Sequence, residues 1–163
     1  MVIEDLSRET VMEWLSEVPD PEIPVLTITD LGIVRDVTVN GEVVVALTPT
    51  YTGCPATEVI EQSVVDALHE RGIENVSIDR VLSPPWTTDW ISEEGRDKLR
   101  EYGIAPPESG GSKRALLHGE RNIACPRCSS TNTSLVSEFG STACKASYKC
   151  EDCLEPFEYF KCI

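Results

Sequence analysis

The sequence predicts an α+β protein built from two modules. Within residues 1–104, amphipathic and β-branched runs follow the order helix, strand, strand, helix, strand, which is typical of a small two-layer α-β-β-α-β domain, here with a helical extension. Six of the seven cysteines lie after residue 124, in a module at residues 123–163. Residues 105–122 begin rich in Pro, Gly, Ser and Glu and are expected to form a linker between the modules.

The first helix is expected at about residues 7–18, where Ser7 can act as the N-cap and apolar residues recur at helical spacing. Three prolines in residues 19–24 end this helix and predict a rigid loop. The loop carries two carboxylates, Asp20 and Glu22. They could accept hydrogen bonds from the backbone, as is ordinary in turns, or supply hard oxygen ligands to a metal.

A β-hairpin is expected from residues 33–39 and 42–47, because Asn40-Gly41 between two β-branched runs indicates a type I′ turn. The second strand is apolar on both faces, which predicts a central position in the sheet. The next helix runs to about Arg71, and Gly72 is placed to terminate it. A third strand follows at residues 75–82, and a further helix at about residues 92–102 forms the extension.

Two tryptophans, Trp86 and Trp90, lie in a segment that begins with Pro84-Pro85. Such a segment cannot form one regular face. The tryptophans either hold the helical extension against the domain or present aromatic anchors to a partner. The sequence leaves both interpretations open.

Cys54 follows the apolar strand and precedes Pro55, which suits the first helical position. This predicts Cys54 as the N-cap. A thiolate there would face the free N–H groups and the positive end of the helix dipole, which favours metal binding or nucleophilic chemistry. The alternative is a small packed residue without a chemical role.

The C-terminal module has about 41 residues, too few to hold itself with an apolar core alone. Two C-x2-C pairs, Cys125/Cys128 and Cys150/Cys153, predict a zinc-ribbon-like fold around one tetrahedral ion. An iron–sulfur cluster also takes four thiolates and is the alternative, with Cys144 and Cys162 as additional candidate ligands. The strand residues expected to cover the site are Leu135, Val136, Phe139, Tyr148, Phe157, Tyr159 and Phe160.

The formal net charge of −14 falls entirely on residues 1–105, which hold 21 acidic and 7 basic side chains, whereas residues 106–163 hold 7 of each. Phosphate repulsion argues against nucleic-acid binding by the acidic part. The sequence has no apolar run near 18 residues and no leader-like N-terminus, so we expect no membrane association and a cytoplasmic location.

Residues 18–82 resemble the small domain of iron–sulfur cluster assembly factors related to SufT. The motifs that carry the resemblance are Asp20-Pro21-Glu22-Ile23-Pro24, Asp30-Leu31-Gly32 and Thr52-Gly53-Cys54-Pro55. In that family the cysteine equivalent to Cys54 is implicated in cluster assembly or delivery. The resemblance therefore implies that Cys54, with Asp20 and Glu22, handles a transient iron or iron–sulfur unit.

The remaining motifs resemble the PaaD family, which is a family of phenylacetyl-CoA epoxidase components. They are Pro85-Trp86-Thr87-Thr88-Asp89-Trp90, Cys125-Pro126-Arg127-Cys128, Gly140-Ser141-Thr142-Ala143-Cys144-Lys145 and Pro156-Phe157-Glu158-Tyr159-Phe160. The resemblance implies an accessory protein of aerobic phenylacetate degradation that assists the maturation of an oxygenase system. It also implies other epoxidase components, oxygenase or reductase, as partners.

The residues agree with a non-catalytic role, since no Glu-x-x-His pair, dinucleotide-binding glycine loop or Ser-His-Asp arrangement stands out. Two functions remain open: a maturation factor that uses Cys54, or an adaptor that holds oxygenase and reductase components together. Whether the chain forms a homodimer is also left open by the sequence.

Overall fold

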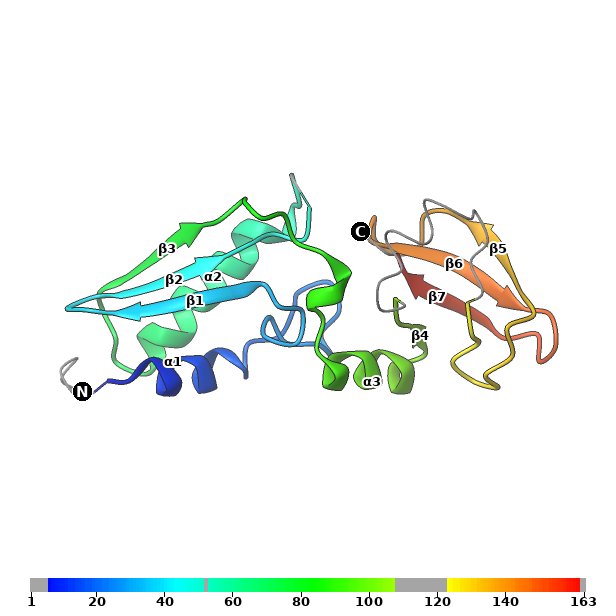
Figure 1. Cartoon of the computed structure of the whole chain (residues 1–163), viewed down its shortest axis with the longest axis horizontal. Helices are drawn as coiled ribbons and strands as arrows, with labels where there is room; N and C mark the ends of the chain where they lie inside the picture. Colours follow the sequence, from blue (N-terminus) through cyan, green and yellow to red (C-terminus); the bar gives the residue numbers. More distant parts are fainter. Residues whose placement is uncertain (1–5, 52, 108–122, 162–163) are drawn as a thin grey trace. The chain divides into compact units, whose positions relative to one another are not determined.

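The computed structural model describes residues 6–51, 53–107 and 123–161. The chain divides into two compact units, Met1–Ser92 and Glu93–Ile163, which are described separately (Figure 1). Within the described residues, no helix is both long enough and apolar enough to cross a membrane.

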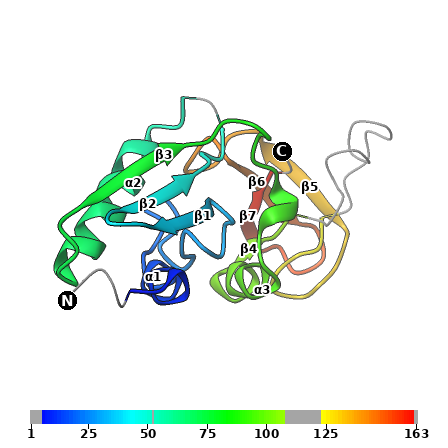
Figure 2. The same cartoon turned by 60° about the vertical axis from the view of Figure 1, so that its left-hand side comes forward.

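The N-terminal unit is a three-stranded sheet covered by helices. Its strands β1 (Val34–Val39), β2 (Val43–Leu47) and β3 (Val76–Arg80) lie in the order β1-β2-β3. β2 is antiparallel to β1 and parallel to β3, so β2 is central, as predicted. The helix α1 (Arg8–Leu15) precedes the sheet, and α2 (Ala56–Glu70) connects β2 to β3 and packs along one face of the sheet (Figure 2).

Local sequence signals explain how these elements begin and end. The Ser7 side chain accepts a hydrogen bond from the Thr10 amide and caps α1, as expected. At the other end of α2, Gly72 adopts a φ of 85°. Its amide donates to the His69 carbonyl while the Ile73 amide donates to Leu68. These two bonds form the glycine-dependent helix ending that the sequence indicates.

The hairpin is confirmed, but the predicted type I′ turn is wrong. Val39 pairs with Val43, so the loop has three residues instead of two. Gly41 has a positive φ of 72°, whereas Asn40 does not adopt a positive φ. The Asn40 amide donates to the Glu42 carbonyl, which closes the longer loop.

The segment with the two tryptophans folds back onto the N-terminal unit. Trp86 is buried, and its indole nitrogen donates to the Leu31 carbonyl at 2.7 Å. Trp90 ends a short 3₁₀ helix, η2 (Thr88–Trp90), and lies beneath the guanidinium of Arg35 at 3.6 Å from the ring centroid. Of the two interpretations left open above, Trp86 fits the first because it secures the chain to its own domain.

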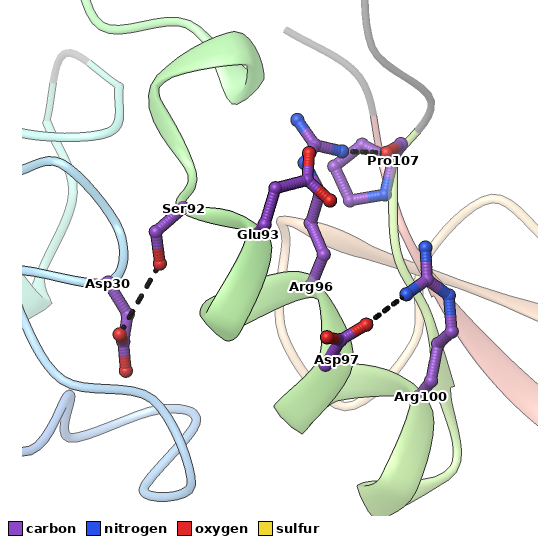
Figure 3. Close-up of polar contacts among 7 residues, drawn as sticks. All are labelled: Asp30, Ser92, Glu93, Arg96, Asp97, Arg100 and Pro107. Carbon is purple, nitrogen blue, oxygen red and sulfur yellow. Dashed lines mark hydrogen bonds and ion pairs between the residues drawn. The ribbon is translucent and has the colours of Figure 1, made fainter.

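The loop that receives the tryptophan segment is tied to it a second time, through Asp30. The Ser92 amide donates to the Asp30 carbonyl at 2.8 Å, and the Ser92 hydroxyl lies 3.4 Å from Asp30 Oδ1 (Figure 3). The other Asp30 oxygen accepts from the Thr27 amide. The Asp30-Leu31-Gly32 motif therefore has a clear structural role in this chain.

The C-terminal unit combines a helix with a four-stranded sheet. It contains α3 (Glu93–Tyr102), β4 (Ile104–Ala105), β5 (Thr133–Ser137), β6 (Lys145–Cys150) and β7 (Pro156–Phe160). The strand order is β4-β7-β6-β5, with β4 parallel to β7 and the other pairs antiparallel.

The sequence analysis assigned residues 93–104 to the N-terminal domain and began the linker at residue 105. In the structure, α3 and β4 belong to the unit that contains the ribbon. The buried Arg96 of α3 donates to the Pro107 carbonyl, and Arg100 pairs with Asp97 at 2.5 Å (Figure 3). Residues 108–122 of the expected linker, and with them Gly110-Gly111, lie outside the described residues.

The ribbon core is smaller than predicted. Tyr148, Phe157, Tyr159 and Phe160 are buried as expected. In contrast, the exposed residues include Leu135, Val136 and Phe139, so the prediction that these three cover the site is wrong. The reason is topological: β5 is the edge strand of the sheet, and nothing in the described residues covers it.

Candidate metal centre and the Cys54 loop

The four cysteines of the two C-x2-C pairs converge as predicted. The sulfur atoms of Cys125, Cys128, Cys150 and Cys153 all lie within 4.8 Å of one another. Cys125 Sγ is 3.7 Å from Cys153 Sγ, and Cys128 Sγ is 3.6 Å from Cys150 Sγ. A tetrahedral ion with metal–sulfur bonds of about 2.3 Å requires sulfur–sulfur separations of about 3.8 Å. The four thiolates therefore fit a single tetrahedral ion.

The two cysteine turns repeat the same backbone geometry. The Cys125 amide donates to the Ser130 carbonyl, and the Cys150 amide donates to the Glu155 carbonyl, in each case five residues further on. The residue after the second cysteine of each turn, Ser129 or Leu154, has a φ of 63°. Neither residue is glycine. Both turns thus adopt a conformation that ordinary side chains avoid, and the repetition indicates that ligand geometry imposes it.

Polar side chains cross from each cysteine turn to the other. Arg127, between the first two cysteines, pairs at 2.7 Å with Glu155, which follows the last. Asp152, between the second two cysteines, accepts hydrogen bonds from Ser130 and Asn132, which follow the first pair. These reciprocal contacts hold the two turns together. The sequence analysis did not identify them, and the only available signal was their position beside the ligands.

The thiols have unequal proton affinities in the metal-free chain. A hydrogen bond from the Cys153 amide, helped by the Asp152 amide and the Cys128 thiol, lowers the pKa of Cys150 to about 7. The Ser130 amide lowers the pKa of Cys128, but burial and hydrogen bonds with the other three cysteines outweigh it and raise that pKa to about 12. The lower value at Cys150 shows that the site already favours a thiolate before a cation arrives.

Neither additional candidate ligand joins this group. Cys144 is buried, and its sulfur lies 3.0 Å from the Thr142 hydroxyl. It is not a member of the four-sulfur group. Cys162 lies outside the described residues.

The Cys54 loop starts where three segments meet at one end of the N-terminal sheet. The Thr48 amide donates to the Ile33 carbonyl, and the Val81 amide donates to the Leu47 carbonyl. Cys54 follows this junction and is partly exposed. Its amide donates to the Tyr51 carbonyl, and the Thr50 hydroxyl lies 4.0 Å from its sulfur.

Cys54 is not the N-cap of α2, so the prediction is wrong by one residue. The cap is Pro55, whose φ of −66° and ψ of −22° are already helical, and the helix begins at Ala56. The Cys54 carbonyl still accepts from the Thr57 amide at 3.2 Å, which places the cysteine directly before the first turn.

Asp20 has a defined role in its proline-rich loop. Its Oδ1 accepts hydrogen bonds from the Glu22 amide at 2.9 Å and from the Ile23 amide at 2.8 Å. Asp20 is buried and Glu22 is partly exposed. Within the described residues, Cys54, Asp20 and Glu22 do not form a group of three donors able to hold an ion; the four-cysteine group is the one such group there.

Comparison with known proteins accounts for both parts of the chain. Residues 8–79 match the family described as iron-sulfur cluster assembly protein, and residues 109–161 match the PaaD zinc beta ribbon domain. A protein of Escherichia coli (strain K12), named there as the fourth or D component of 1,2-phenylacetyl-CoA epoxidase, is 57% identical over 150 residues, covering 91% of this chain and 89% of that protein. The chain belongs to the PaaD family.

Other relatives correspond to the first part of this PaaD-family chain. An Fe-S protein maturation auxiliary factor of Porphyromonas gingivalis (strain ATCC BAA-308 / W83) is 37% identical over 96 residues, covering 57% of this chain and 90% of that protein. The crystal structure of a DUF59 domain from Bacillus anthracis has a TM-score of 0.53 and 29% identity, covering 56% of this chain and 90% of that one. The α+β fold and the zinc-ribbon family of the C-terminal module are both as predicted from the sequence.

Proposed function

We propose that this protein is a non-catalytic accessory component that assists the maturation of iron or iron–sulfur centres in a phenylacetyl-CoA epoxidase system. The observation that carries the proposal is the joining, in one chain, of an iron–sulfur assembly domain to the PaaD ribbon. A component of that system gains access to client proteins in the cytoplasm. Its oxygenase or reductase partners are the clients that this proposal implies.

In this proposal, Cys54 is a transient ligand for the cargo. A soft sulfur ligand suits iron and iron–sulfur units. The partly exposed thiol stands at the start of α2 beside the Thr50 hydroxyl, on a loop that the strand ends hold in place. Since no group of three donors surrounds it among the described residues, it would bind cargo weakly enough to release it.

Asp20 and Glu22 take different parts in this proposal. The Asp20 carboxylate shapes the proline-rich loop, because one of its oxygens receives two backbone amides. Glu22 is partly exposed and would offer an oxygen ligand when cargo and client arrive. Asp20 thus acts as a positioning residue in this proposal.

The ribbon would hold zinc in a structural role. Four thiolates around one tetrahedral ion leave no open coordination position for chemistry. A cluster contains inorganic sulfides between its irons and therefore holds its cysteine sulfurs farther apart than a single ion does. The separations of 3.6 and 3.7 Å support a single ion over the cluster alternative. Metal analysis that finds iron and sulfide, with a visible charge-transfer band after anaerobic purification, would refute zinc.

The second candidate function is an adaptor that holds oxygenase and reductase components together without handling metal. The exposed apolar residues of the ribbon favour it, since such residues are typical of interaction surfaces. The two functions differ in what they require of Cys54: the adaptor needs no thiol there, whereas the maturation factor does.

The deciding experiment compares two cysteine variants in cells that depend on the epoxidase system. We expect Cys54→Ser to lower epoxidase activity and the iron content of the purified client at least about tenfold, while the variant protein folds and still binds its partners. Cys144→Ser is the matched control, because Cys144 lies outside both candidate sites. Normal activity and client iron with Cys54→Ser would refute delivery and leave the adaptor function.

A further inference from the structure

An uninterrupted exposed patch lies on the C-terminal unit, far along the chain from Cys54. Leu135 and Val136 of the edge strand β5 are 49% and 66% exposed, and Phe139, which follows the strand, is 67% exposed. All three occur within five consecutive residues. β5 itself, Thr133–Ser137, contains no charged residue. Edge strands are usually protected by charge or proline, and β5 has neither.

The loop that presents Phe139 is held in a fixed conformation. The Ser137 hydroxyl donates to the Phe139 carbonyl and accepts from the Phe139 amide. The Lys161 ammonium donates to the Glu138 carbonyl at 3.0 Å and lies 4.6 Å from the centre of the Phe139 ring. An exposed aromatic ring that is already ordered loses little conformational entropy when it is buried by a partner.

Two charges at the edge of this patch have no counterion. Neither Glu138 nor Lys161 takes part in an ion pair among the described residues, although the Lys161 ammonium reaches the Glu138 backbone. One free anion and one free cation beside an apolar patch make a surface that is complementary to itself. A two-fold contact would pair Glu138 of each copy with Lys161 of the other.

The wider charge distribution also suits contact between copies of this module. Residues 106–163 hold 7 acidic and 7 basic side chains, whereas residues 1–105 carry the whole net charge of −14. Two copies that meet through the ribbon therefore bring balanced modules together, whereas contact through the N-terminal units would bring two strongly negative surfaces together.

We propose that Leu135, Val136 and Phe139, with Glu138 and Lys161 at their edge, form a homodimer interface with a second copy of this chain. The contact is made by side chains. A register shift between Leu135 and Ser137 leaves Val136 without a partner in β6, so the outer edge of β5 is too irregular to continue a β-ladder into the second copy. The proposal is independent of cargo delivery by Cys54.

The test measures the oligomeric state of the full metal-loaded chain by sedimentation equilibrium over a range of concentrations. We expect a concentration-dependent dimer whose Kd rises at least about tenfold in Val136→Lys and in Phe139→Ser. Tyr102→Ser is the matched control, because Tyr102 is an aromatic residue of the same unit that is 62% exposed, and its Kd should equal that of the wild type.

A charge exchange distinguishes the proposed pairing from a general loss of apolar contact. Lys161→Glu should weaken the dimer because it places two carboxylates opposite each other, and the double variant Glu138→Lys/Lys161→Glu should recover part of the loss. Metal content confirms that each variant is folded. A monomer at every concentration, or a dimer whose Kd is unchanged by Val136→Lys and Phe139→Ser, would overturn the proposal. Burial of the patch by a different protein while this chain stays monomeric would also overturn it.

Discussion

The indole nitrogen of Trp86 donates a hydrogen bond to the backbone carbonyl of Leu31 across 2.7 Å, and both residues are buried. The two residues are 55 positions apart in the sequence. This bond, together with the contacts of Ser92 to Asp30, fixes the tryptophan segment on the loop that leads into β1. The same loop end carries Ile33, whose carbonyl receives the Thr48 amide at the start of the Cys54 loop. The position of the Cys54 loop therefore depends on a well-ordered loop before β1.

Trp86→Phe should destabilise the N-terminal unit by about 2 kcal/mol, because the Leu31 carbonyl then remains buried without its donor. All three tryptophans lie in this unit, so tryptophan fluorescence during urea unfolding reports on it alone. The control is Trp14→Phe, since Trp14 is only partly buried on α1 and its ring meets the Arg71 guanidinium instead of a backbone acceptor. Equal losses in the two variants would contradict a specific role for the indole nitrogen.

Gly32 and Gly41 separate backbone strain from steric conflict. Both have a positive φ, 70° and 72°. A Cβ atom at Gly32 would lie 2.6 Å from the Trp90 carbonyl oxygen and 2.8 Å from its Cβ, whereas a Cβ at Gly41 meets nothing within 4 Å. We expect Gly41→Ala to cost about 1 kcal/mol, from backbone conformation alone. Gly32→Ala should cost about 2 kcal/mol more, because the tryptophan segment must move. Similar losses in urea unfolding would show that the segment yields without cost.

The parts of this fold that local sequence determines were predictable. Ser7 caps α1 and Gly72 ends α2, and each signal acts within one turn of a helix. The four cysteine ligands were equally clear, since their spacing alone fits one ion. Pairings between distant residues were not predictable. The two-residue strand β4 joins β7 across more than 50 residues, and no periodicity can appear in so short a strand.

Exposure depends on such pairings too. Val136 and Phe157 are both apolar residues of ribbon strands, yet Phe157 is buried and Val136 is exposed. The difference follows from strand order, because β7 is internal and β5 is at the edge. For the same reason the sequence placed apolar residues of β5 over the metal centre, where the structure does not.

Lys145 and Glu158 form the most buried ion pair of the ribbon among the described residues, with Lys145 Nζ 2.8 Å from the Glu158 carboxylate. Glu158→Gln keeps an acceptor for the Ser141 amide but leaves the buried ammonium without its counterion. We expect a loss of about 2 kcal/mol, less than for a fully buried pair because Glu158 remains partly exposed. In Lys145→Met/Glu158→Gln the loss should be smaller than the sum of the two single losses. Strict additivity in thermal unfolding would show that the pair does not interact.

The Arg8 side chain, which starts α1, hydrogen-bonds Asp36 of β1 at 3.0 Å. This bond and one from the Val37 amide lower the pKa of Asp36 from its usual 3.8. A lowered carboxyl pKa means that the stabilisation is complete above about pH 4 and is lost as the pH falls through the folded pKa. In Arg8→Gln, NMR titration should show the Asp36 pKa shifted upward, toward 3.8. The carboxyl of Asp66, which accepts from Gln62 instead of an arginine, should titrate unchanged. An Asp36 pKa that does not move would show that the Val37 amide alone lowers it.

The four-cysteine centre should determine whether the ribbon folds, because its apolar core contains only a few residues from β4, β6 and β7 and the segment around Cys125. Binding of a structural metal contributes on the order of 10 kcal/mol in small modules of this kind, far more than such a core supplies. Cys128→Ser removes one ligand and should release the ion and unfold the ribbon, including the pairing of β4 with β7. Cys144→Ser should keep one ion per chain, since Cys144 is outside the ligand group.

Two measurements on the same sample separate the ribbon from the rest of the chain. Metal analysis and amide hydrogen exchange in β6 and β7 report on the ribbon, whereas the urea midpoint from tryptophan fluorescence reports on the N-terminal unit. In Cys128→Ser we expect loss of the ion and of protection in these strands, with an unchanged fluorescence midpoint, because the reciprocal contacts of Arg127 and Asp152 lie entirely within the ribbon. Retained protection in metal-free β6 and β7 would mean that the strands fold without the ion, and that the centre serves a purpose other than stability.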